Sequence, residues 1–208
     1  PRMELLKNDI MYQYIKAFKT NYDEKFKPKK DDFDKAEKEL SRLYIKGLME
    51  QNPKDNFYPD ANSSIRLTYG KVKPYMNFEY ITYLDGVIEK NEKFSDNPEF
   101  DVPQNLVDAY NKKDFGNYTD KTGQVPVCFI TDNDITGGNS GSPVMDAKGR
   151  LIGLAFDGNW EAMSGNISYN PKKQRCIVVD VRYVLWIMDK LGGATNLIEE
   201  MKIDNSAI

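Results

Sequence analysis

The sequence predicts an α+β chain, in which a helical segment precedes an antiparallel β-sheet and a C-terminal helix. Three observations carry this prediction. Residues 3–49 hold apolar side chains at helical spacing, with many Lys, Asp and Glu residues between them. Residues 126–156 contain three strand-like runs that are separated by a glycine-rich loop and a short turn. Residues 181–191 are again apolar at helical spacing, and Gly192-Gly193 ends them.

The helical segment consists of two amphipathic stretches. The first covers residues 3–26, and the run Lys-Pro-Lys-Lys at 27–30 interrupts it. Asp31 or Asp32 can cap a second helix, because an aspartate side chain accepts hydrogen bonds from the free amides of the first turn. Two helices joined by so short a linker predict an antiparallel helical hairpin.

The sequence becomes β-like after the helical segment. Residues 64–72 alternate apolar and polar side chains, which predicts a strand, whereas residues 75–88 fit a strand or a short helix. The charged stretch 89–99 is expected to be a loop. Residues 104–112 are expected to form a short helix, because a proline stands just before them and suits the start of a helix.

Length, charge and cysteine content limit the possible architectures and partners. The 208 residues can form two small domains, and we place a helical segment at 1–60 and a β-rich domain at 61–208. The 29 basic and 32 acidic residues nearly balance, which argues against a nucleic-acid partner. No apolar run reaches the roughly 18 residues of a membrane span. Cys128 and Cys176 lie in apolar runs, either as buried thiols or as one disulfide between neighbouring strands.

A serine stands in the loop between the first two strand-like runs. Residues 136–144 read TGGNSGSPV, with Ser140 at the centre. Attack on an acyl carbon needs a hydroxyl at a sharp bend beside amide N–H groups, and glycines allow that bend. The same string is compatible with an ordinary glycine-rich hairpin turn. Because it is long and lies between two strand-like runs, we predict that Ser140 is a nucleophile.

The chain contains no histidine. A serine hydroxyl needs a base to take its proton, so neither a Ser-His-Asp triad nor a histidine-rich metal site can be built from these residues alone. Lys148 is near Ser140 in sequence, but it lies in a run typical of a solvated hairpin turn. We therefore expect no metal and no cofactor, an inactive isolated chain, and a base in another part of a longer parent chain.

The serine loop carries a resemblance. Its pattern Gly-x-Ser-Gly-x-Pro resembles the nucleophile loop of chymotrypsin-like serine peptidases, in which the amides corresponding to Gly138 and Ser140 form the oxyanion hole. The order of strands suits an antiparallel β-barrel lobe and differs from the strand–elbow–helix order of an α/β-hydrolase. Related zymogens commonly have an aspartate at the position of Asn139, where it pairs with a new amino terminus. We expect this loop to form without one.

Longer runs narrow the resemblance to one family. GGNSGSPV is similar to the glutamyl endopeptidases and to the S46 dipeptidyl-peptidases. Over most of residues 61–200 the chain resembles the C-terminal part of the S46 family of bacterial dipeptidyl-peptidases 7 and 11, in the runs SSIRLTYGKVKPY, LIGLAFDGNWEAMSGN and QRCIVVDVRYVLWIMDKLGG. The helical segment fits the end of the helical domain that this family inserts into its catalytic unit, and the rest fits the second barrel lobe.

The resemblance implies a serine peptidase that releases dipeptides from the free amino termini of oligopeptides, through an acyl-enzyme on Ser140. The histidine and aspartate of the triad would lie upstream in the remainder of the parent chain, together with the groups that bind the substrate's amino terminus. The resemblance also implies a full-length enzyme that is a homodimer, located in the periplasm or at the cell surface of a bacterium.

Phe156, Asp157 and Gly158 match the strand that walls the family's pocket for the residue before the scissile bond. The family varies between glycine and arginine at the position of Gly158, and an arginine would bind an acidic side chain. Glycine leaves space without charge, which favours larger uncharged side chains, although overall similarity could still place the chain with the Asp/Glu-specific type. Alternatively, Gly158 is needed only for a bend after the strand.

Two other functions remain open at this point. A glutamyl endopeptidase would use the same chemistry, but it would normally carry its histidine within a chain of this length. A non-catalytic binding or dimerisation module could retain a vestigial serine loop. A serine-directed phosphonate applied to the parent protein separates this last function from catalysis, because only an activated hydroxyl reacts.

Overall fold

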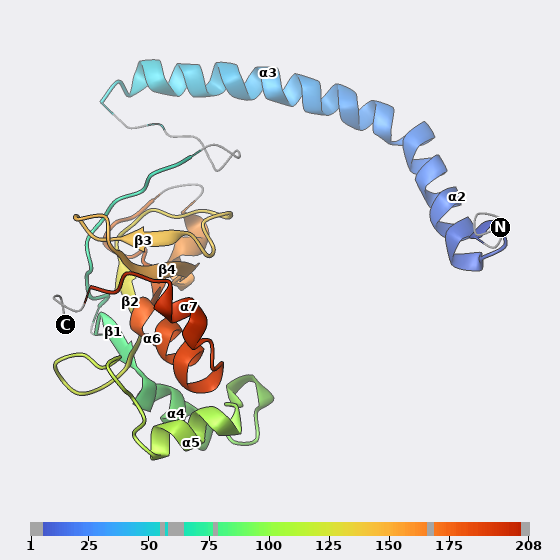
Figure 1. Cartoon of the computed structure of the whole chain (residues 1–208). Helices are drawn as coiled ribbons and strands as arrows, with labels where there is room; N and C mark the ends of the chain where they lie inside the picture. Colours follow the sequence, from blue (N-terminus) through green and yellow to red (C-terminus); the bar gives the residue numbers. More distant parts are fainter. Residues whose placement is uncertain (1–5, 55–56, 58–64, 77–78, 166–168, 205–208) are drawn as a thin grey trace. The chain divides into compact units, whose positions relative to one another are not determined.

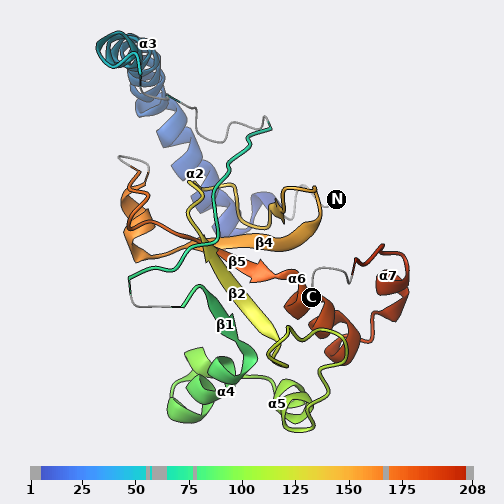
Figure 2. The same ribbon diagram turned by 90° about the vertical axis from the view of Figure 1, so that its left-hand side faces the viewer.

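A computed structural model describes the fold (Figures 1 and 2). The chain divides into two compact units, Pro1–Pro59 and Asp60–Ile208, which are described in turn. The described residues are 6–54, 57, 65–76, 79–165 and 169–204.

The first unit is built from two helices, α2 (Ile10–Lys25) and α3 (Lys27–Gln51). The Asp9 side chain caps α2, because its carboxylate accepts a hydrogen bond of 2.8 Å from the Tyr12 amide. No residue of either helix is buried within the described structure. Figure 1 shows the two helices following one another as a bent rod.

The helical character of this unit is confirmed, but the antiparallel hairpin is wrong. Phe26, between the two helices, keeps α-helical backbone angles (φ −107°, ψ −43°), and the Lys30 amide donates to its carbonyl. Pro28 stands in the first turn of α3, where its missing N–H leaves no hydrogen bond unmade. The chain therefore bends without reversing, and α3 begins before Asp31 and Asp32, which do not cap it.

The second unit contains an antiparallel five-stranded sheet in the order β1-β2-β5-β4-β3. The strands are β1 (Ile81–Tyr83), β2 (Pro126–Thr131), β3 (Pro143–Met145), β4 (Leu151–Gly158) and β5 (Cys176–Asp180). Figure 2 shows β1, β2, β5 and β4 side by side. The predicted α+β class is confirmed. Among the described residues the sheet ends at β1 and β3, so its closure into a barrel stays a prediction.

Short helices surround this sheet. They are α4 (Leu84–Lys93), η1 (Pro98–Phe100), α5 (Gln104–Asn111), η2 (Trp160–Ser164), α6 (Val181–Trp186), η3 (Ile187–Leu191) and α7 (Thr195–Glu199). The helix predicted at 181–191 is confirmed, with its second half wound as a π-helix. The Asp180 carboxylate caps it by accepting from the Arg182 amide at 2.9 Å. The predicted loop at 89–99 is wrong in its first half, because α4 continues to Lys93.

Two apolar clusters hold the unit together. The first joins α4, α5 and α6 around the fully buried Trp186, whose indole N–H donates to the Asp114 carbonyl at 2.8 Å. The second lies within the sheet and consists of Phe129, Ala155, Cys176 and Val178. Because Ala155 also lines the pocket described below, the sheet core directly supports the candidate site.

The strand predicted at 64–72 is wrong for the described residues. Only Val72 makes a bridge, to Thr131 of β2, and residues 65–70 belong to no strand. The apolar side chains that produced the alternating pattern, Ile65, Leu67 and Tyr69, are exposed. Alternation predicts a half-buried strand only where a partner strand and a core are present, and no described element covers these side chains.

The two cysteines are free thiols. The register places Cys128 opposite Val179 and Cys176 opposite Thr131, three positions apart along the β2–β5 ladder. This separation is too large for a disulfide, whose Cα atoms lie about 4.4–6.8 Å apart. Burial raises the pKa of the Cys176 thiol to about 11, so the thiol stays protonated at neutral pH.

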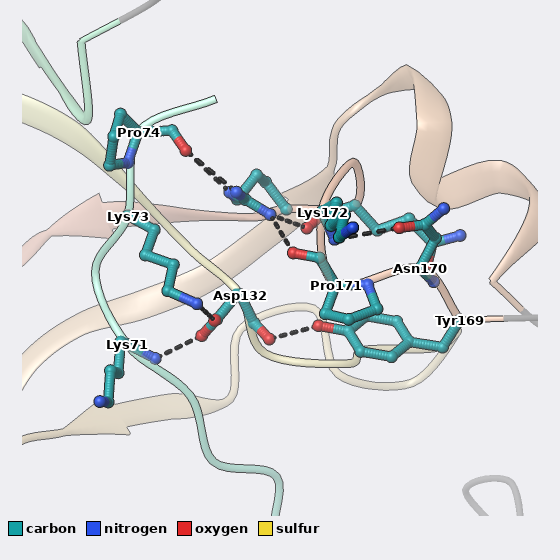
Figure 3. A network of polar contacts seen from close by, with 10 residues as sticks. Lys71, Lys73, Pro74, Asp132, Tyr169, Asn170, Pro171 and Lys172 are labelled. Carbon is teal, nitrogen blue, oxygen red and sulfur yellow. Dashed lines mark hydrogen bonds and ion pairs between the residues drawn. The ribbon is translucent and has the colours of Figure 1, made fainter. Parts of the chain in front are cut away.

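The segment 70–73 lies against the end of β2 (Figure 3). The Asp132 carboxylate accepts from the Lys71 amide and from the Lys73 ammonium, both at 2.5 Å. The Asp132 amide in turn donates to the Lys71 carbonyl at 3.0 Å. A Cβ atom at Gly70 would lie 2.6 Å from the Asp132 carboxylate and 2.8 Å from the Asn133 amide, so this approach requires glycine.

Replacing Gly70 by alanine is expected to lower the free energy of unfolding by about 1–3 kcal/mol, because the added methyl group overlaps the Asp132 carboxylate and the Asn133 amide. Urea denaturation measures this change. Gly86→Ala is the matched control, since a Cβ there meets nothing within 4 Å and the residue lies in α4. Equal stabilities of the two variants would contradict the prediction.

Candidate active site

The loop between β2 and β3 forms a tight bend around Ser140. Gly138 (φ +103°) and Gly141 (φ +79°) flank this serine in backbone conformations that side chains disfavour. The Gly141 amide donates to the Ala155 carbonyl of β4 at 2.7 Å, and the Ala155 amide donates back to the Ser142 carbonyl at 2.9 Å. The bend is thus tied to the sheet, while Ser140 itself remains exposed.

Asn139 braces this bend from within. Its side-chain oxygen accepts from the Thr136 amide at 3.0 Å, and its own amide donates to the Thr136 carbonyl at 3.1 Å. Its carbonyl accepts from the Ser142 amide at 2.9 Å. Reasoning from the sequence treated Asn139 only as a neutral residue that forms no ion pair with a new amino terminus. In the structure Asn139 has a further role, because its hydrogen bonds connect Thr136 before the turn to Ser142 after it.

A pocket of about 220 Å³ opens beside Ser140. Its walls come from the serine loop, from the end of β4 and from η2. Of the predicted site residues, Ser140, Phe156, Asp157 and Gly158 all line it. Gly138 lies in the same bend but is absent from the described lining, to which its neighbour Gly137 contributes. The amides of Gly138 and Ser140 donate to no other residue in the described part of the chain.

A β-bulge at Phe156 shapes the β4 wall of the pocket. Ala155 pairs with Val178 and Asp157 pairs with Ile177, so Phe156 is an extra residue on β4. A bulge redirects the side chains around it, and such bulges are over-represented next to active sites. Here the Phe156 side chain is left 61% exposed. The Asp157 carboxylate accepts from the Gly158 amide at 2.7 Å.

Gly158 is required for reasons of space. A Cβ atom at this position would lie 2.7 Å from the Cβ of Ala162 in η2, closer than side chains pack. The backbone of Gly158 does not occupy the left-handed region, so its conformation alone would tolerate another residue. The glycine therefore allows η2 to lie directly against β4, which favours the steric interpretation over that of a bend after the strand.

The pocket carries one charge among its described lining residues, that of Asp157. No lysine or arginine belongs to this lining. Within the described ranges, no three His, Cys, Asp or Glu side chains are placed to hold a metal ion together. Nor does any helix in these ranges have the length and apolar character needed to cross a membrane.

Buried Arg175 supports one wall of the pocket, because its backbone amide donates to the side-chain oxygen of the lining residue Asn159 at 2.8 Å. The sequence did not indicate this role. The Arg175 guanidinium donates to the carbonyls of Pro74 and Pro171, both at 3.0 Å, and of Gln174 at 2.7 Å. Figure 3 labels Pro74 and Pro171, whose carbonyls accept two of these hydrogen bonds. Because Pro74 and Arg175 lie 101 positions apart, no local pattern in the sequence indicates this contact.

Comparisons with known proteins agree with the resemblance seen in the sequence. The family model described as Peptidase S46 matches residues 2–203. A dipeptidyl-peptidase 7 of Phocaeicola vulgatus is 47% identical over 208 residues, which cover 98% of this chain and 28% of the relative. An Asp/Glu-specific dipeptidyl-peptidase of Flavobacterium psychrophilum is 47% identical over 200 residues, which cover 94% of this chain and 28% of that relative.

Solved structures give the same result. The structure of Porphyromonas endodontalis DPP11 in complex with the dipeptide Arg-Asp matches with a TM-score of 0.72 and 40% identity, over 79% of this chain and 24% of that one. The chain thus spans less than a third of the length of these relatives. With the family model matched over residues 2–203 and this fold shared, the chain belongs to the peptidase S46 family.

Proposed function

We propose that the protein containing this chain is a chymotrypsin-like serine dipeptidyl-peptidase, which releases dipeptides from the amino termini of oligopeptides. The observation that carries the proposal is the placement of Ser140, exposed in a glycine-flanked bend and on the wall of a pocket. The names of the two relatives, both dipeptidyl-peptidases, support the reaction class.

In this mechanism the Ser140 oxygen attacks the carbonyl carbon that follows the second substrate residue. A histidine from the remainder of the parent chain takes the serine proton, since this sequence has none, and an aspartate orients that histidine. The amides of Gly138 and Ser140 donate to the oxyanion. The histidine then protonates the leaving amine, and water hydrolyses the acyl-enzyme on Ser140 to free the dipeptide.

Phe156, Asp157 and Gly158 form the wall for the side chain before the scissile bond, and we expect that side chain to be uncharged. Asp157 is the single charge in the described lining and repels an acidic side chain. Because relatives of both specificity types are 47% identical to this chain, the preference rests on Asp157 and Gly158.

The proposal extends to assembly and location. We expect the full-length enzyme to be a homodimer in the periplasm or at the surface of a bacterial cell. The bacterial sources of the relatives support a bacterial protein. Light scattering of the purified full-length protein measures its mass, and cell fractionation locates it.

Mass spectrometry of peptide products tests the proposed reaction. The full-length protein is incubated with oligopeptides that differ only in whether the amino terminus is free or acetylated. Release of amino-terminal dipeptides from the free peptide alone is expected, because the free amine fixes where the substrate sits. Cleavage of both peptides at internal glutamates would instead support a glutamyl endopeptidase. The absence of any product would support a non-catalytic module.

A further inference from the structure

The wall of the pocket that faces β4 is the short helix η2, which contributes Ala162 and Met163 to the lining. A helix of this length is not held in place by its own hydrogen bonds, so its position depends on contacts with the rest of the chain. Gly158 of β4 and Ala162 of η2 both line the pocket, and a Cβ at Gly158 would lie only 2.7 Å from the Ala162 Cβ. A shift of η2 relative to β4 therefore changes the width of the pocket.

Asn159 fixes the beginning of η2. Its side-chain oxygen accepts from the Arg175 amide at 2.8 Å, and its backbone amide donates to the Arg175 carbonyl at 2.9 Å. Its side-chain amide donates to the Lys173 carbonyl and to one carboxylate oxygen of Glu161, both at 2.8 Å. The start of η2 is thus bound to residues 173–175, which lead directly into β5, and Glu161 belongs to the same hydrogen-bond network.

The other carboxylate oxygen of Glu161 accepts a hydrogen bond from the Tyr75 hydroxyl. Tyr75 comes from a segment 86 positions earlier in the chain, which Arg175 holds by donating to the Pro74 carbonyl and by lying 6.0 Å from the Tyr75 ring. The Asp132 contacts with Lys71 and Lys73 anchor the same segment at its other end (Figure 3). Glu161 therefore connects η2 to a segment that is itself fixed to the sheet.

The protonation states of this pair suit a permanent contact. The hydrogen bond from Tyr75 lowers the pKa of the Glu161 carboxyl, so that the acceptor is ionised at neutral pH. The same hydrogen bond raises the pKa of Tyr75, which keeps its hydroxyl protonated as the donor. A hydrogen bond to an ionised acceptor is stronger than one between neutral groups.

We propose that Tyr75 and Glu161 are positioning residues that determine specificity: through their contact they fix η2 against β4 and so set which side chains fit before the scissile bond. This inference rests on the proposed function, since it assigns a role in that pocket. Neither residue is among the described lining residues, so neither is placed to touch the reacting atoms. Losing the contact frees η2 to shift, so the pocket discriminates less among side chains while the chemistry at Ser140 continues.

The test compares variants of the full-length protein on a series of dipeptide substrates that differ only in the residue before the scissile bond, from alanine to phenylalanine. Tyr75→Phe keeps the ring and removes the hydroxyl, and Glu161→Ala removes the acceptor. For each variant the ratio between the highest and the lowest kcat/KM in the series is expected to fall by about tenfold, mainly through KM, because the fit of one methylene group in an apolar pocket is worth about tenfold or more. The Ser140 labelling rate by a small phosphonyl fluoride is expected to change less than twofold.

Three controls separate positioning from a general structural effect. Tyr69→Phe alters an exposed tyrosine of the same segment and is expected to keep the wild-type spread. Glu161→Gln is expected to keep most of the wild-type spread that Glu161→Ala loses, because glutamine can accept from Asn159 and donate to the Tyr75 hydroxyl. In the double variant Tyr75→Phe/Glu161→Ala the effects are expected not to add, since both remove one contact.

An unchanged spread in both Tyr75→Phe and Glu161→Ala would overturn the inference. So would an equal loss of kcat on every substrate with the spread preserved, which is the signature of a merely structural role. If one variant does not fold, the other tests the same contact from its opposite side. Failure of the wild-type protein to react with the phosphonyl fluoride at Ser140 would overturn the proposed function itself, which distinguishes the two failures.

Discussion

Replacing Ser140 by alanine in the full-length enzyme is expected to lower kcat for dipeptide release by about 10⁴- to 10⁶-fold. Alanine removes the oxygen that forms the acyl-enzyme and leaves the bend intact, since the hydrogen bonds that hold this loop in the described structure do not use the serine side chain. Binding of the substrate is expected to persist, so KM should change far less than kcat. Steady-state kinetics with a fluorogenic dipeptide substrate measures both constants.

Ser142→Ala is the matched control for this experiment. Ser142 lies two positions away in the same loop and contributes its backbone to two hydrogen bonds, but its side chain is not in the described pocket lining. We expect its kcat to stay within a few-fold of the wild-type value. A loss of activity in Ser142→Ala equal to that in Ser140→Ala would refute the assignment of the nucleophile.

Replacing Gly158 by arginine is expected to lower kcat/KM by about 100-fold for substrates with an uncharged side chain before the scissile bond. The new side chain overlaps Ala162, whose Cβ would lie 2.7 Å from the added Cβ, and it brings a positive charge into a pocket lined by Asp157. Because a guanidinium binds carboxylates through two parallel hydrogen bonds, the ratio of activities is expected to move toward glutamate. Competition between paired leucine and glutamate substrates measures this ratio.

Two further variants decide whether space or charge causes the change. In Gly158→Arg/Ala162→Gly the overlap is relieved, and activity on the glutamate substrate is expected to exceed that of Gly158→Arg alone. Gly47→Arg adds the same charge in α3, where a Cβ meets nothing within 4 Å, and is expected to leave the ratio unchanged. A wild-type preference in Gly158→Arg would show that this wall does not select the side chain.

The sequence predicts those elements whose pattern is local. β2, β4 and β5 are short apolar runs bounded by turns, and α6 begins directly after a capping aspartate, so each can be located from a few neighbouring residues. The serine bend is predictable for the same reason, since its glycines stand beside the serine that they expose.

The remaining features depend on contacts between distant residues. The bend at Phe26 follows from backbone angles that no residue pattern specifies, which is why a hairpin was expected there. The run Ile65, Leu67 and Tyr69 alternates like a strand but has no partner strand in the described structure. Tyr75 and Glu161 meet across 86 positions, and neither residue type alone indicates a role in the pocket.

The central claim is that Ser140 is an activated nucleophile in a site that recognises a free amino terminus. The most direct measurement treats the full-length protein with a dipeptidyl phosphonate, with its amino terminus either free or acetylated, and locates the label by peptide mass spectrometry. We predict rapid labelling of Ser140 by the free reagent and little labelling by the acetylated one. Labelling of a different serine, or no labelling of a protein that still releases dipeptides, would contradict the account.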